Sequence, residues 1–110
     1  MMSGIDEGSL VIVHCSNPRE KMWGAVVRLD GAGLVIRGLD LESVEDWLRQ
    51  EKAGSDTLIQ PSTSFVPMQR ILRIDLDEST LAVPSYADRF HAACNRDVRD
   101  ALLDSGGPDA

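Results

Sequence analysis

The residues best suited to chemistry lie near the end of the chain. His91 and Cys94 are three positions apart in a segment with helical spacing, and Asp88 and Asp97 flank them at the same step. Imidazole, thiolate and carboxylate groups are ligands of zinc sites, and a histidine next to a cysteine can activate a thiolate nucleophile. A zinc site and a cysteine-based active site are therefore the two chemical hypotheses to weigh.

A second pair of such residues, His14-Cys15, lies in an apolar run near the start of the chain. His14 and Cys15 cannot both join a zinc site with His91 and Cys94, because neighbouring residues of a strand point to opposite faces of the sheet. We therefore expect no metal: Cys15 and Cys94 are predicted to be apolar core residues, and His91 to lie at the core boundary.

The glycine-rich stretch "GAGLVIRG" does not predict a cofactor site. It leads into a strand, whereas phosphate-binding and dinucleotide-binding loops lead into a helix. We expect no catalytic residue and no cofactor, and thus a protein that is not an enzyme.

The overall charge argues against a nucleic-acid partner. Eighteen acidic and 11 basic side chains give a net charge of −7, and the Lys and Arg residues form no run. Affinity for nucleic acid comes mainly from cationic groups that displace counterions from phosphates. If RNA is bound, the candidate residues are Arg37, Arg70 and Arg73. For Arg70 and Arg73, which lie close together in the sequence, the favoured alternative is that they are solvated ends of strands.

Alternation of apolar and polar residues predicts a mainly β chain. Strands are predicted at residues 10–15, 21–29, 34–39, 65–68 and 71–76. Asp30 and the two glycines after it predict a hairpin turn, and Gly24 predicts a bend or a close approach of two strands. Pro67 cannot donate to a ladder of hydrogen bonds, so the fourth strand is predicted to lie at an edge or to end there.

Two segments change to helical spacing. Residues 42–53, with Trp47 on their apolar side, predict a helix inserted between the third and fourth strands, and Ser43 with Asp46 resembles a capping box. Residues 85–103 predict one amphipathic helix that begins at Ser85 and covers either its own sheet or that of a neighbour.

The ends of the chain and its hydropathy predict where the protein is located and which segments are flexible. Residues 1–8 are polar and acidic, unlike a secretory leader, and no apolar run is long enough for a membrane span. We expect residues 1–8 to be flexible, residues 104–110 to be a disordered tail, and the protein to be cytoplasmic with no membrane partner. A single domain of 110 residues commonly gains stability by self-association.

The hairpin and the last two strands resemble the Sm-like family of small β-barrels. Gly24 and Asp30 are six positions apart, like the glycine and the turn aspartate of that family's first motif, and "FVPMQRILRIDLDE" resembles the second. The resemblance covers residues 9–78. It implies a five-stranded Sm-like or SH3-like small β-barrel, here with an inserted helix and a C-terminal helix. It also implies a ring of roughly six or seven subunits, in which the fourth strand of one subunit pairs with the fifth of the next.

The usual ligand of the family is single-stranded RNA, and the residues that contact it are not matched here. Leu34 stands where the family has an asparagine after the turn aspartate, and Pro67, Met68 and Gln69 stand near its Arg-Gly or Lys-His pair. The resemblance therefore carries over the fold and not the RNA site.

These observations predict a non-catalytic, homo-oligomeric binding or assembly module. Its partners are expected to be copies of itself and an unidentified protein, which makes it an interaction scaffold or regulator. Trp47, Pro67 and Phe90 are the expected interface residues. The alternative is an RNA-binding Sm-like protein that uses a non-standard basic site.

Overall fold

A computed structural model describes residues 4–54 and 58–103. The expected tail at 104–110 lies outside these residues, as do the first three residues of the expected flexible segment 1–8. The elements, in chain order, are β1 (Leu10–Cys15), β2 (Glu20–Asp30), β3 (Gly33–Asp40), the 3₁₀ turn η1 (Leu41–Ser43), α1 (Val44–Ala53), β4 (Ser62–Pro67), the 3₁₀ turn η2 (Met68–Arg70), β5 (Ile71–Leu76), α2 (Tyr86–Cys94) and α3 (Val98–Leu103). All five predicted strands are present.

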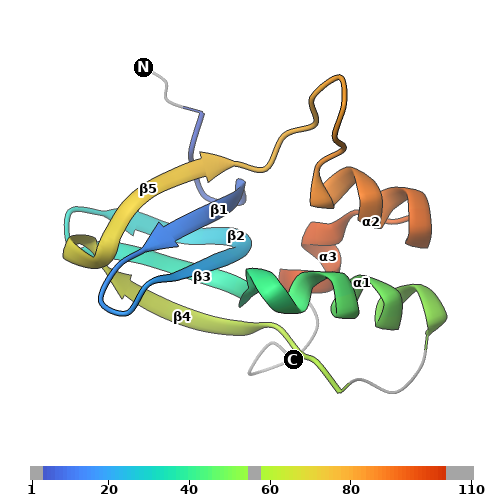
Figure 1. Cartoon of the computed structure of the whole chain (residues 1–110), viewed down its shortest axis with the longest axis horizontal. Coiled ribbons are helices and arrows are strands. Elements are labelled where there is room, and N and C mark those ends of the chain that lie inside the picture. Colours follow the sequence, from blue (N-terminus) through green and yellow to red (C-terminus); the bar gives the residue numbers. More distant parts are fainter. Residues whose placement is uncertain (1–3, 55–57, 104–110) are drawn as a thin grey trace.

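The strands form one antiparallel sheet in the order β4-β3-β2-β1-β5. The sheet is open, since β4 and β5 form its two edges and do not pair with each other in the described chain (Figure 1). The predicted closed barrel is therefore not confirmed: the protein is a mixed α/β fold with an open, curved sheet. Pro67 does lie on an edge strand, as its missing amide hydrogen predicted.

Two facing glycines allow β2 and β3 to approach each other closely. Gly24 of β2 lies opposite Gly38 of β3, and a Cβ atom on Gly24 would come 2.3 Å from the carbonyl oxygen of Arg37. Only glycine permits this approach, which confirms the role predicted for Gly24. The turn after β2 is also as predicted, because the Ala32 amide donates to the Asp30 carboxylate at 2.9 Å.

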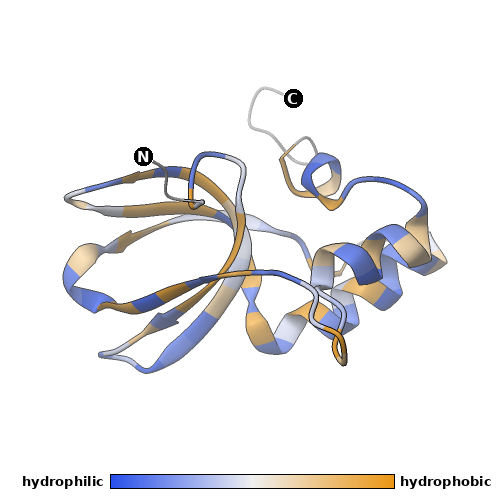
Figure 2. Cartoon of the chain, turned by 90° about the horizontal axis from the view of Figure 1, so that it is seen from above, coloured by the Kyte–Doolittle hydropathy of each residue, from blue (hydrophilic) through white to orange (hydrophobic). Residues whose placement is uncertain are grey.

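Apolar side chains form two cores, one on each face of the curved sheet. Figure 2 shows the curved sheet beside the helices, with apolar residues (orange) along the strands and along the helices. One core fills the curve of the sheet and is built from alternate residues of its strands, such as Val11, Val26 and Ile36. The other lies between the sheet and the helices and includes Trp23, Trp47 and Phe90. In it the Trp47 ring stacks on Phe90 at 5.4 Å between centroids and meets Trp23 at 5.8 Å.

The predicted C-terminal helix is two helices. The residue after α2, Asn95, has φ of 58° and ends it in the left-handed conformation, so α3 begins anew at Val98. The start of α2 is as predicted, since the Ser85 hydroxyl accepts a hydrogen bond from the Asp88 amide at 3.0 Å. The matching cap at Ser43 is not formed by its side chain, and the 3₁₀ turn η1 leads into α1 instead.

Residues just before β1 are held against the sheet. The Gly8 amide donates to the carbonyl of Val26 at 2.8 Å, and the Gly8 carbonyl accepts from Arg99 at 2.7 Å. Within residues 4–54 and 58–103, none of the helices has the length and the apolar composition needed to cross a membrane.

Candidate functional site

The two open edges of the sheet carry unpaired backbone groups. On β4, the Met68 amide just past the strand donates to Ala32 at 2.9 Å, and the register with β3 has no shift. Antiparallel ladders use every second residue, so Val66 and Ser64 bond to β3 while Phe65 and Thr63 direct their amides and carbonyls outward. The outward groups therefore repeat along β4.

The backbone groups of β5 alternate in the same way. The Asp77 amide donates to Leu10 at 2.8 Å, and Val11 to His14 pair with Leu76 to Arg73 in constant register. Asp75 and Arg73 thus bond to β1, while Leu76 and Ile74 direct their amides and carbonyls outward. Among the described residues, each edge therefore has at least two residues whose backbone donors and acceptors point away from the sheet without a neighbouring strand.

Exposed apolar side chains lie on both edge strands and in the turn that joins them. Phe65 on β4 is 53% exposed, Leu72 on β5 is 66% exposed, and Met68 in the turn between them is 38% exposed. Leu72 is the extra residue of a bulge, since His14 pairs with Arg73 and Cys15 with Ile71. The sequence places both residues in strands, but nothing in it predicts their exposure.

Two of the three residues expected at an interface lie in the core and not at a sheet edge. Trp47 is 1% exposed and Phe90 is 0% exposed, both in the core between the sheet and the helices. Their expected role as interface anchors is therefore corrected, because each side chain is already covered within its own chain. Pro67, at the end of the β4 edge, lies among the outward-facing residues of that strand.

The arginines expected to contact RNA have separate partners within the chain. Arg37 donates to the Leu102 carbonyl at 2.8 Å, which fixes α3 on the sheet. Arg70 donates to the Ser16 and Pro18 carbonyls at 2.9 and 2.8 Å. Arg73 bonds to Asp75 at 3.1 Å on the exposed face of β5.

The residues considered for chemistry are not assembled into one site. No group of three His, Cys, Asp or Glu side chains that could hold a metal occurs in the described parts of the chain. His14 instead bonds to Asp75 at 3.0 Å. Burial raises the pKa of the Cys15 thiol and of the Cys94 thiol, which lowers the fraction of reactive thiolate. The prediction that Cys15 lies in the core is confirmed, whereas Cys94 is half-buried and His91 is exposed.

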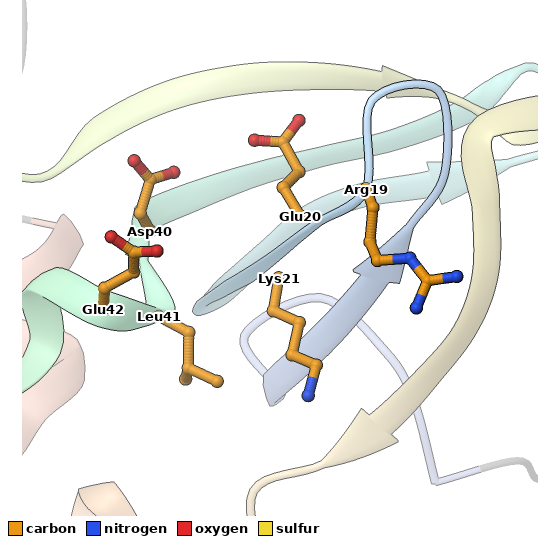
Figure 3. A pocket seen from close by; sticks show the side chains of 6 residues that line it. All are labelled: Arg19, Glu20, Lys21, Asp40, Leu41 and Glu42. Carbon is orange, nitrogen blue, oxygen red and sulfur yellow. The ribbon is translucent and has the colours of Figure 1, made fainter.

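A hollow lined by charges lies where β2 begins and β3 ends, and we call it the charged hollow (Figure 3). Its volume is about 590 Å³, and its lining residues are Arg19, Glu20, Lys21, Asp40, Leu41 and Glu42. Sequence reasoning missed it, since Glu42 looks like an ordinary acidic residue at a helix start and the hollow arises only when the two strand ends meet.

Comparison of the chain with protein-family models, with curated proteins and with solved structures finds no match.

Proposed function

We propose that the chain is a non-catalytic, Sm-like binding module that assembles with copies of itself, with edge β4 of one copy paired to edge β5 of the next. The observation that carries this proposal is the pair of open edges on one curved sheet, each with free backbone groups and an exposed apolar side chain. The resemblance of residues 9–78 to Sm-like barrels gives the same pair of strands as the joint between subunits.

The directions of the edge strands support this pairing. Four successive antiparallel pairs give β4 and β5 the same sense along the sheet. The sheet curves over, however, so at its two edges the arrows of β4 and β5 point in opposite directions in space (Figure 1). Copies that keep one orientation would therefore meet with antiparallel edges. Thr63 and Phe65 on β4 and Ile74 and Leu76 on β5 offer outward groups with the two-residue spacing that an antiparallel ladder needs.

The chemistry of the β4 edge also favours assembly. Edge strands that must stay unpaired commonly carry charges, above all lysine. No residue of β4 is charged, and its exposed aromatic ring would be buried by a neighbouring strand. Pro67 lacks an amide hydrogen, but it lies at the last position of β4, so the outward groups of Phe65 and Thr63 stay available.

A protein partner fits this module better than RNA. The net charge is −7, and the three candidate arginines are engaged in contacts within the chain. We therefore favour an interaction scaffold, with RNA binding as the alternative.

The proposal is tested by the mass in solution, measured by size-exclusion chromatography with light scattering over a range of concentrations. The wild-type chain is expected to have a mass several times 12.0 kDa. Phe65→Asp and Leu72→Asp each place a charge on one edge and are expected to reduce the mass to that of one chain.

Val27→Asp is the matched control, because Val27 is also exposed but lies on β2, inside the sheet. This variant should keep the wild-type mass. A wild-type mass of one chain at every concentration would refute the proposal.

A further inference from the structure

The charged hollow separates charges of opposite sign. Asp40 and Glu42 gather on one side of it, and Arg19 and Lys21 lie on the other side (Figure 3). Glu20, which also lines the hollow, has its carboxylate paired with Arg70 at 2.7 Å. The other four charged side chains form no hydrogen bond or ion pair with any residue that the structure describes. Elsewhere in the same chain opposite charges do meet, as in the pairs Arg89–Glu45 and Arg96–Glu51, each at 2.6 Å.

The basic side of the hollow is fixed by Arg70. This guanidinium reaches from η2 and donates to the carbonyls of Ser16 and Pro18 and to the Glu20 carboxylate at 2.7 Å. It thereby holds the backbone of the turn that presents Arg19 and the first residues of β2 that present Lys21. The backbone from which these two exposed side chains extend is therefore set before any ligand arrives.

The acidic side is fixed by the sheet and the core. Asp40 pairs with Met22 in the ladder between β3 and β2, and Leu41 packs against the core between sheet and helices. The next residue, Glu42, belongs to the 3₁₀ turn that leads into α1. Neither backbone segment can move toward the other without breaking these contacts, so the acidic and the basic side chains extend from opposite sides of the hollow.

We infer that the charged hollow binds a small zwitterionic ligand, with its anionic group at Arg19 and Lys21 and its cationic group at Asp40 and Glu42. The chemical class is that of free amino acids and short peptides with free termini. A volume of about 590 Å³ suits a ligand of this size, and the half-buried Leu41 provides an apolar contact for its side chain. Two charge-assisted contacts at a fixed separation would select such a ligand over one that carries a single charge.

Calorimetric titration with alanyl-leucine tests the inference. The dipeptide is expected to bind one to one, and the form with acetylated and amidated termini at least about tenfold more weakly. Lys21→Ala and Glu42→Ala should each weaken binding about tenfold, the effect of losing one charge-assisted hydrogen bond.

Lys52→Ala and Glu7→Ala are the matched controls, because both side chains are exposed and neither lines the hollow. They should bind the dipeptide as the wild-type chain does. Absence of binding up to about 10 mM dipeptide, or equal losses in the controls, would overturn the inference. The result does not depend on assembly, which the mass in solution reports separately.

Discussion

Gly24 and Gly38 face each other in neighbouring strands with no room for a side chain, so a single methyl group there has a large effect. A Cβ atom on Gly24 would lie 2.3 Å from the Arg37 carbonyl oxygen, and this neighbour is backbone that cannot rotate away. Gly24→Ala should lower the free energy of unfolding by about 3 kcal/mol, as measured by urea denaturation. Gly31→Ala is the control: a Cβ there meets nothing within 4 Å, so the change should stay within about 0.5 kcal/mol.

Arg70 is the second residue whose role is structural. It satisfies two backbone carbonyls and one carboxylate at the turn between β1 and β2. Arg70→Ala should lower the free energy of unfolding by about 2 kcal/mol, because these acceptors lose a charged donor. Arg73→Ala, at an exposed position on β5, should change it by less than about 1 kcal/mol.

The same two variants decide whether the RNA alternative holds. In a gel-shift assay at low salt we expect no shift with the wild-type chain. A salt-sensitive shift that both variants lose would instead support an RNA site at these arginines.

At the scale of elements, α1 and α2 are joined by an ion pair that depends on pH. Arg89 donates two hydrogen bonds to Glu45, at 2.7 and 2.6 Å, and these bonds hold the pKa of the Glu45 carboxyl below its ordinary value. A lowered pKa in the folded state means that the pair stabilises the fold above the ordinary pKa of 4.5. The contribution is lost as the pH falls through the folded-state pKa.

Glu45→Gln should therefore be less stable than the wild-type chain at neutral pH and equally stable at low pH. The difference at pH 7 should be about 0.5 kcal/mol, since the pair is exposed to solvent. Urea denaturation at about pH 7 and about pH 3 measures it. A difference that persists at the lower pH would contradict the assigned role.

The strands were predictable because their signal is local. The alternation of apolar and polar residues predicted the first and last residues of β1 and β5 correctly. It predicted the ends of the other three strands to within three residues. Two features depend on contacts that alternation does not encode. The bulge that exposes Leu72 arises from the pairing of β5 with β1, and the break at Asn95 interrupts a stripe that looks continuous.

The whole molecule was less predictable than its elements. A run of five bent strands is consistent with either a closed or an open sheet, and closure depends on whether β4 reaches β5 in space. The sequence therefore could not predict that both edges stay open. The sequence also could not predict the burial of Trp47 and Phe90, because an aromatic residue on an amphipathic helix can face either its own core or a partner. The charged hollow combines residues from two strands and a turn, so no short motif marks it.

Assembly through two different edges predicts that two variants, each blocked at one edge, can still pair with each other. A contact between unlike surfaces continues from copy to copy, whereas a contact between like surfaces stops at a pair. Phe65→Asp blocks only β4, and Leu72→Asp blocks only β5. A mixture of the two variants retains one competent joint, between β5 of the first and β4 of the second.

The most direct test is to measure the mass in solution of each variant alone and of an equal mixture. We expect one chain for Phe65→Asp alone, one chain for Leu72→Asp alone, and two chains for the mixture. A mass of two chains for either variant alone would show that like edges pair. A mixture that stays at one chain, beside a wild-type protein that assembles, would show that copies join through some other surface, and the account of β4 and β5 would be wrong.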